Sequence, residues 1–118
     1  MKLDVQSEEG NVTLVAVQGE VKQKDLAEHE DPLADLLGED CYRRKVLLNL
    51  RGVESLDSSG VGWLLSCHKA FRTQGGMLVL HSVSPFARDV LKMLKMHLVL
   101  HIADDEAEAR KLAQGEMP

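Results

Sequence analysis

Two neighbouring serines near the middle of the chain are the residues best placed to do chemistry. Ser58 and Ser59 lie between Asp57 and Gly60, where a predicted buried strand leads into a predicted helix. The Ser58 oxygen can cap this helix by accepting a hydrogen bond from an amide of its first turn. Because Gly60 and Gly62 carry no side chain, the turn stays uncovered, and an anion there would meet backbone N–H groups.

Ser58 can also be weighed as the nucleophile of a hydrolase, because it stands between a strand and a helix. The Gly-x-Ser-x-Gly pattern of such enzymes is absent, since Leu56 occupies the place of the first glycine, and no histidine has a recognisable partner role. Gly60-Val61-Gly62 lacks the third glycine of a dinucleotide site, and the chain has no Gly-Lys-Ser/Thr phosphate loop. We therefore expect no catalytic residue and no cofactor, and interpret the chain as a non-enzymatic protein.

We expect no metal site among the histidines and cysteines. His97 and His101 lie four residues apart in a predicted strand, which places them about 13 Å apart along the chain. His68 is expected at the edge of the core, with its polar atoms hydrogen bonded. Cys41 and Cys67 are interpreted as packing residues of a reduced compartment, since two thiols without a secretory context do not make a disulfide framework.

Length and composition limit the class of protein. A chain of 118 residues is the size of one domain, and 44% hydrophobic with 28% charged residues is typical of a soluble globular protein. The formal charge of -5 disfavours direct binding to nucleic acid. The N-terminus has no apolar signal core, and no window approaches the run of about 18 apolar residues that spans a bilayer. We expect a cytoplasmic protein without direct membrane insertion.

The elements that must position Ser58 follow an alternating pattern. Val46–Leu50 belongs to a short apolar run suited to a central strand buried on both faces. Asp31-Pro32 and Ser84-Pro85 are start signals for helices, and Gly75-Gly76 is a stop signal. In chain order we predict strands at 3–7 and 12–17, a helix at 33–37 ended by Gly38, a strand at 45–50, a helix from 58 to Gly75-Gly76, a strand at 77–80, a helix from Ser84-Pro85, a strand at 98–102 and a helix from 104–106.

This order, β-β-α-β-α-β-α-β-α, predicts a single α/β domain over residues 1–118 with a mixed four- to five-stranded sheet packed by helices. The ordered part is expected at about 2–113, with a frayed tail at 114–118. The helix that starts at Pro85 carries apolar residues on one face: Phe86, Val90, Leu91 and Leu94. Three further apolar residues are expected in the core rather than in a surface patch: Met93, Met96 and Leu98.

Three segments together resemble a known family. Gly19-Glu20 after the hairpin, the strand Val46–Leu50, and Asp57–Gly60 opening a helix are similar to the anti-sigma factor antagonists of the STAS domain family. This family also includes the cytoplasmic domains of sulfate transporters. The resemblance covers nearly the whole chain and implies a single STAS-like domain.

The resemblance implies a switch between partners. In similar proteins the serine after the aspartate is phosphorylated by an anti-sigma factor that is also a serine kinase, and the matching residue is Ser58. The unphosphorylated antagonist binds the anti-sigma factor, the phosphorylated form releases it, and a serine phosphatase resets it. The implied partner-binding residues are Asp57, Ser58, Ser59, Gly60, Val61, Gly19 and Glu20.

Several alternatives stay open at this point. Lys22 stands where relatives carry an acidic residue, which leaves the identity of the kinase open, and Ser59 is a second candidate for modification. Trp63 either packs at the flank of its helix or anchors an interface. The chain can also be a constitutive cytoplasmic STAS subunit of an ABC-type lipid or anion transport assembly, with Ser58 as a helix cap. A weak homodimer is a further open interpretation.

Overall fold

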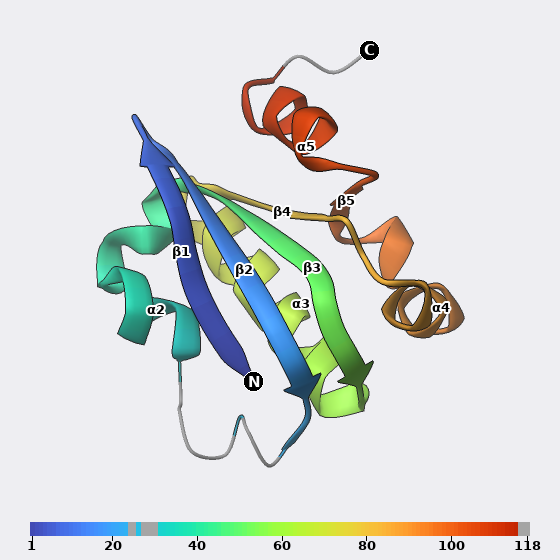
Figure 1. Ribbon diagram of the computed structural model, residues 1–118. Helices are drawn as coiled ribbons and strands as arrows, with labels where there is room; N and C mark the ends of the chain where they lie inside the picture. The colour runs from blue at the N-terminus through green and yellow to red at the C-terminus, as the bar shows by residue number, and fades with distance from the viewer. Residues whose placement is uncertain (24–25, 27–30, 116–118) are drawn as a thin grey trace.

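The computed structural model describes residues 1–23, 26 and 31–115, and its centre is a five-stranded mixed sheet (Figure 1). The strands lie side by side in chain order, with β1 antiparallel to β2 and every later neighbouring pair parallel. The middle strand contains the apolar run at 45–50, which confirms the prediction that this run forms the sheet centre. The strands are β1 Lys2–Glu9, β2 Val12–Val21, β3 Lys45–Leu56, β4 Met77–His81 and β5 His101–Ala103.

Helices cover both faces of the sheet. The α-helices are α2 Pro32–Leu37, α3 Ser58–Gln74, α4 Pro85–Met93 and α5 Glu106–Ala113, and the 3-10 helices are η1 Glu39–Arg43 and η2 Met96–Leu98. Alternate residues of a strand point to opposite faces, so Val46 contributes to a large core with α2, α3 and α4, whereas Leu47 contributes to a smaller core with α5. The mixed sheet with helices on both faces confirms the predicted fold class.

The helix starts predicted at Asp31-Pro32 and Ser84-Pro85 are confirmed by their caps. Asp31 accepts a hydrogen bond from the amide of Ala34, and Ser84 accepts one from the amide of Ala87, with proline as the first helical residue in both cases. At its other end α3 closes on Gly75, whose φ of 91° lies in the left-handed region that favours glycine. These signals are local, so they can be recognised without the tertiary structure.

Two predicted strands differ from the structure. The second strand was expected to end before Gly19, but β2 continues to Val21 through an irregularity in its pairing with β3, where Gly19 adopts a φ of 87°. The apolar run at 98–102 was expected to be one strand. Its beginning instead belongs to η2, because Lys95 turns the chain with a φ of 58°, and only His101–Ala103 pairs with β4. The predicted frayed tail at 114–118 lies partly outside the described residues.

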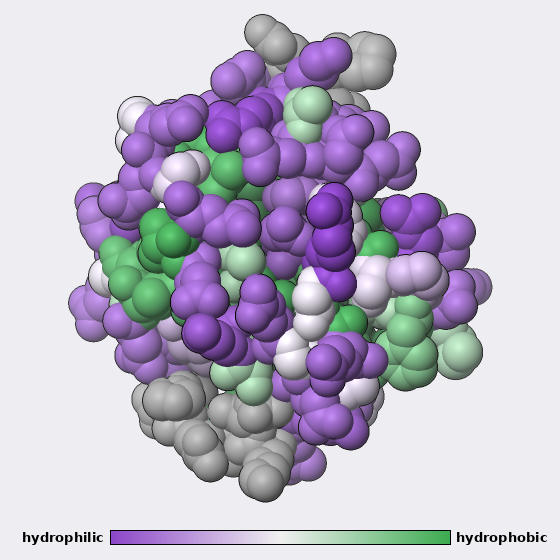
Figure 2. Space-filling model, viewed as in Figure 1, coloured by the Kyte–Doolittle hydropathy of each residue, from purple (hydrophilic) through white to green (hydrophobic). Residues whose placement is uncertain are grey.

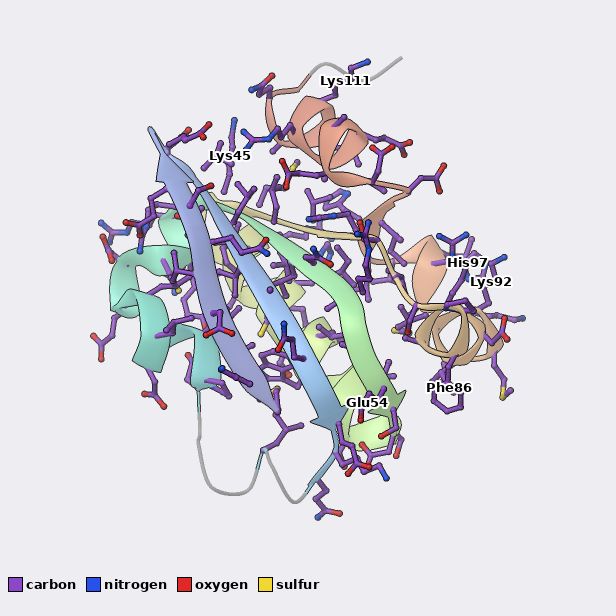
Figure 3. All side chains as sticks on the ribbon, viewed as in Figure 1. Lys45, Glu54, Phe86, Lys92, His97 and Lys111 are labelled. Carbon is purple, nitrogen blue, oxygen red and sulfur yellow. The ribbon has the colours of Figure 1, made fainter. Side chains whose placement is uncertain are left out.

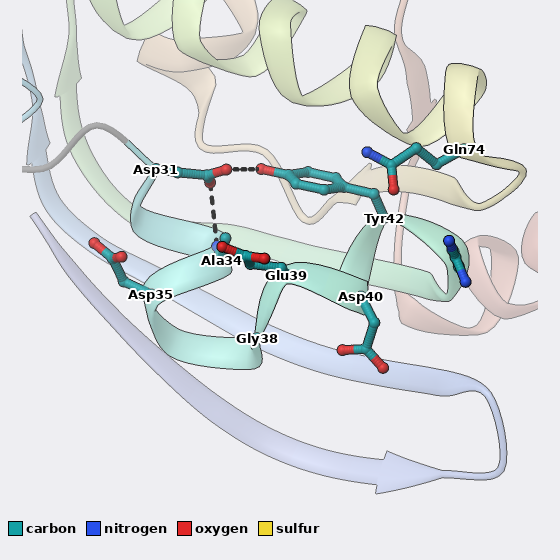
Figure 4. Close-up of a pocket in the computed structure, with 9 residues that line it drawn as sticks. Asp31, Ala34, Asp35, Gly38, Glu39, Asp40, Tyr42 and Gln74 are labelled. Atoms are coloured by element: carbon teal, nitrogen blue, oxygen red, sulfur yellow. Dashed lines mark hydrogen bonds between the residues drawn. The ribbon is translucent and has the colours of Figure 1, made fainter.

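Side-chain contacts hold η1 against the start of α2 and against the C-terminal part of α3. Asp31 accepts a hydrogen bond from the Tyr42 hydroxyl as well as from Ala34, as Figure 4 shows. The ring of Tyr42 meets that of Phe71 edge to face at 5.0 Å. Asp31 thus fixes both the first turn of α2 and the position of η1 against α3.

The C-terminal part of the large core is smaller than the sequence predicts. Phe86 and Leu94 were expected on one face with the core residue Leu91, but they are 53% and 44% exposed. Met93 and Leu98, expected in the core, are 78% and 74% exposed. Of the apolar residues in question, Leu91 is buried, and Val90 and Met96 pack against the core while partly exposed. Burial along α4 thus follows Ala87 and Leu91, which lie four residues apart on one side of the helix.

Candidate functional site

The start of α3 lies at the carboxyl ends of β2 and β3. The last paired residues of these strands are Val21 and Leu56, and Figure 1 shows both arrowheads beside the first turn of α3. The backbone amide of Asp57 donates a hydrogen bond to the carbonyl of Val21 at 3.4 Å. The carboxyl edge of parallel strands is the common place for a functional site in sheets of this kind.

Asp57 is the N-cap of α3. Its Oδ1 accepts a hydrogen bond from the amide of Gly60 at 2.9 Å, and its Oδ2 accepts one from the amide of Gln23 at 3.2 Å. The prediction that Ser58 caps the helix is therefore wrong, since Ser58 is the first helical residue. The cap falls one residue earlier because Asp57, and not Ser58, has the extended backbone that an N-cap requires.

Ser58 is exposed at the surface, and Ser59 is half-buried beside it. In the part of the chain that the structure describes, the Ser58 hydroxyl makes no hydrogen bond. It therefore needs no rearrangement of its own contacts to meet another molecule. The amides of the first turn of α3 lie next to it, with that of Gly60 already bonded to Asp57.

Gly60 and Val61 belong to the interior of this site. A Cβ on Gly60 would lie 2.3 Å from the carbonyl oxygen of Val21, so only glycine lets α3 pack this closely on the end of β2. Val61 is 5% exposed and packs in the large core. The Val61 side chain is therefore part of the core and is not available to a partner at the surface. Gly62, by contrast, faces open space.

Gly19 and Glu20 lie on the strand next to the one that leads to Ser58. Gly19 pairs with Val53 and Glu20 with Ser55 across the parallel β2–β3 pair. The exposed Glu20 carboxylate lies 3.8 Å from the Lys22 ammonium group. Lys22 thus places a cation at the same edge of the sheet as Asp57.

The hydrogen bond from Gln23 to Asp57 is the contact that sequence reasoning missed. It joins residues 34 positions apart, and nothing in the local sequence around either residue indicates it. The short interval between Val21 and Gln23 would have placed this loop near Asp57 only once the strand pairing was known.

His68 and His101 lie side by side elsewhere in the fold. Their rings are 5.3 Å apart. Among the described residues the buried Nδ1 of His68 has no hydrogen-bond partner, so the expectation that its polar atoms are bonded is wrong. Burial, together with the nearby His101 and Arg72, lowers the pKa of His68. His97 lies in η2 and not on a common strand with His101. Within residues 1–23, 26 and 31–115, no group of three or more metal-ligating side chains occurs.

Of the two alternatives for Trp63, the structure supports packing, since the side chain is 9% exposed and belongs to the large core.

A surface hollow lies near the opposite end of α3 from Ser58. It is lined by Asp31, Asp35, Glu39, Asp40, Tyr42 and Gln74 among others (Figure 4). Gln74 is the last residue of α3 and Ser58 the first, so the helix separates this hollow from the serine by about 25 Å.

Among the described helices, none has the length and apolar character needed to cross a membrane.

The chain is similar to regulatory proteins over nearly its full length. The anti-sigma F factor antagonist of Paenibacillus polymyxa is 25% identical over 114 residues, covering 92% of this chain and 93% of the relative. The structure of an anti-sigma-factor antagonist (STAS) domain protein from Planctomyces limnophilus is 26% identical, has a TM-score of 0.70, and covers 91% of this chain and 93% of its own.

The unphosphorylated form of the anti-sigma factor antagonist SpoIIAA, from Bacillus, has the same fold. Its TM-score is 0.71 at 18% identity, and the match covers 99% of this chain and 100% of that one. The model of the STAS domain matches residues 25–109, which is more than half of the chain. The protein therefore belongs to the STAS domain family.

Proposed function

We propose that this protein is a cytoplasmic, non-enzymatic anti-sigma factor antagonist that is switched by phosphorylation of Ser58. The unphosphorylated form binds an anti-sigma factor that is also a serine kinase, the phosphorylated form releases it, and a serine phosphatase resets the cycle. The observation that carries the proposal is the division of roles at the start of α3. Asp57 caps the helix, so the exposed Ser58 hydroxyl is not needed to hold the start of α3.

The relatives support the same assignment. The Paenibacillus polymyxa protein is named an anti-sigma F factor antagonist, and SpoIIAA is described in both an unphosphorylated and a phosphorylated form. In the alternative, a constitutive subunit of an ABC-type transport assembly, Ser58 would serve as the helix cap. Asp57 fills that role, so the main structural reason for a serine at position 58 in that alternative is lost.

A phosphate on Ser58 would change the charge of the surface rather than the fold. It adds about -1.5 to -2 charges at neutral pH. It would lie beside the Asp57 carboxylate, which stays engaged with the amides of Gly60 and Gln23. A partner shaped to cover a neutral hydroxyl would then bury several negative charges together, and both repulsion and desolvation oppose that.

The contact surface is expected to centre on Ser58 and Ser59. Asp57 is half-buried next to them, and Gly19 and Glu20 extend the surface along the end of β2. Gly60 acts beneath this surface by letting α3 approach Val21. Lys22 lies at its edge, so a partner with a matching carboxylate is favoured.

The test is the intact mass of the protein purified from its native host, with the fragment covering residues 56–63 mapped. We expect one phosphate on Ser58, its loss in Ser58→Ala, and its retention in Ser59→Ala. Recovery of the anti-sigma factor with the protein should persist in Ser58→Ala and be lost in Ser58→Asp. Ser66→Asp is the matched control, because Ser66 is also exposed on α3. Absence of phosphate under all growth conditions would reject the switch.

A further inference from the structure

A second hollow lies at the amino ends of β4 and β5, beside the last turns of α3. Its volume is about 430 Å³, and we call it the β4–β5 hollow. Met77 and His101, the first residues of the two strands, both line it. His68 and Arg72 line it from α3. The hollow therefore lies at the opposite edge of the sheet from Ser58, which follows the carboxyl end of β3.

Three side chains that can donate hydrogen bonds meet in the β4–β5 hollow. His68 and Arg72 are four residues apart on α3, so they lie on the same side of the helix. The rings of His68 and His101 are 5.3 Å apart and meet edge to face. All three side chains border one space, so a single small ligand can contact all of them.

These donors are not satisfied within the described part of the chain. His68 is 3% exposed, and its buried Nδ1 finds no hydrogen-bond partner there. A buried polar atom without a partner is costly, so native structures usually supply one. Arg72 is exposed, and the structure shows it in no ion pair or hydrogen bond with another described residue. A ligand is therefore the group that can satisfy them.

The charges around the β4–β5 hollow favour an anion. Burial lowers the pKa of His68, and so do the neighbouring His101 and Arg72. Of the described residues that line the hollow, none is an aspartate or a glutamate. The carbonyls at the end of a helix repel anions, but the Phe71 carbonyl at this end of α3 already accepts two backbone hydrogen bonds. Positive charge therefore dominates the hollow.

We propose that the β4–β5 hollow binds the phosphate group of a small phosphate monoester. The Arg72 guanidinium and the His101 ring donate to phosphate oxygens at the mouth, and His68 forms the floor beneath them. A phosphate group presents three terminal oxygens and a carboxylate only two, so phosphate matches three donor side chains better. A divalent metal ion also binds imidazole, but Arg72 would repel it and no carboxylate of the lining would hold it.

The remaining lining favours an ester over free phosphate. Met77 is half-buried and Val99 is 44% exposed, and both line the hollow, so an apolar group of the ligand can contact them. The apolar surface over α4, seen near the right edge of Figure 2, is a different place, since none of the described lining residues belongs to α4. We therefore expect a monoester with an apolar group to bind more tightly than inorganic phosphate.

Titration of the full chain with phenyl phosphate, followed by NMR of the histidine rings and the backbone amides, tests the proposal. At about pH 7.5 and constant ionic strength, the ring signals of His68 and His101 should shift and saturate with a Kd on the order of 1 mM. Inorganic phosphate should bind about fivefold more weakly, because it lacks the apolar group. Equal affinity for the two would overturn the assignment to a monoester and leave a site for free phosphate. Benzoate that binds as tightly as phenyl phosphate would overturn the assignment to phosphate.

Two substitutions with matched controls identify the site. Arg72→Gln should weaken binding of phenyl phosphate about tenfold, because it removes charge-assisted hydrogen bonds. Lys69→Gln removes the same charge from an exposed position of α3 outside the lining and should not weaken it. His101→Gln should weaken binding about threefold, whereas His97→Gln should not. His97 is exposed on η2, and Figure 3 shows its side chain at the outer edge of the molecule.

Shifts that do not saturate overturn the proposal. Equal weakening by Arg72→Gln and Lys69→Gln also overturns it, since general attraction to positive charge would behave in that way. Shifts confined to the backbone amides of residues 58–60 would place the phosphate at the start of α3 and overturn it as well. The proposal does not depend on phosphorylation of Ser58, and the two tests can fail independently.

Discussion

The carboxylate of Asp57 accepts a hydrogen bond from the backbone amide of Gln23 at 3.2 Å and so joins the end of β2 to the start of α3. The other oxygen of the same carboxylate caps the helix through Gly60. One side chain therefore fixes two segments that are distant in sequence and holds the neighbouring Ser58 at the surface. Asp57 makes the hydrogen bonds that hold this turn, and the Ser58 hydroxyl is left available for contact with a partner.

This division of roles predicts different effects for two adjacent substitutions. Asp57→Ala removes the helix cap and the contact with Gln23, so it should lower the free energy of unfolding by about 1–2 kcal/mol. Ser58→Ala removes an exposed hydroxyl and should change the free energy by no more than about 0.5 kcal/mol. Urea unfolding followed by circular dichroism measures both values. Equal losses in the two variants would contradict the assignment of the cap to Asp57.

The glycines of the same turn make a second matched pair. Gly60→Ala would bring a Cβ to 2.3 Å from the Val21 carbonyl oxygen, so α3 must shift, at a cost of about 2 kcal/mol or more. Gly62→Ala meets no atom within 4 Å and should stabilise the helix by about 0.5–1 kcal/mol. Thermal unfolding should therefore show a lower Tm for the first variant and a higher Tm for the second. If both variants shifted the Tm in the same direction, the close approach of α3 to β2 would not be what determines the effect of an added Cβ.

The parts of this site that the sequence can predict are those with local causes. The strand-to-helix order around Ser58 follows from an apolar run and from helical spacing, and both are properties of neighbouring residues. Asp57 and Ser58 are equally good cap residues, so the sequence cannot choose between them. The choice depends on the carbonyl of Val21 and the amide of Gln23, which reach Asp57 only after β2 and β3 have paired.

The burial of Met93 and Leu98 was predicted wrongly for a different reason. Met93 and Leu98 are apolar, and apolar residues next to a buried helix predict a core. The left-handed turn at Lys95 directs the chain into η2 before β5 begins, and these side chains then face outward. No glycine or asparagine marks this turn, so the sequence contains no signal for it.

Stability should fall as the pH is lowered through the histidine range. Burial lowers the pKa of His81, whose Nε2 has no hydrogen-bond partner in the described part of the chain, and burial likewise lowers the pKa of His68. Below the ordinary histidine value of 6.5 the unfolded chain binds protons that the folded chain resists, so protonation favours unfolding. The stabilisation is thus complete above about pH 7 and is lost progressively below 6.5.

Chemical denaturation at several pH values between about 5 and about 8 tests this dependence, with a slope of at most about 1.4 kcal/mol per pH unit for each histidine. His81→Gln and His68→Gln should each reduce the slope, and the double variant should reduce it most. Comparing slopes rather than absolute stabilities separates the titration from any packing loss. Unchanged slopes in both single variants would assign the pH dependence to other groups.

The two thiols should be unreactive in the folded protein. Cys41 and Cys67 are 0% and 3% exposed, and burial, with a smaller contribution from Asp31, raises their pKa values to about 11 and about 12. Only the thiolate attacks a disulfide reagent, so reaction with an aromatic disulfide at about pH 8 should be at least about a hundredfold slower than in denaturing guanidinium chloride. Ser66→Cys places a thiol on the exposed side of α3 and is the positive control. Native thiols that react as fast as this one would mean that the helix opens far more often than its packing against the sheet implies.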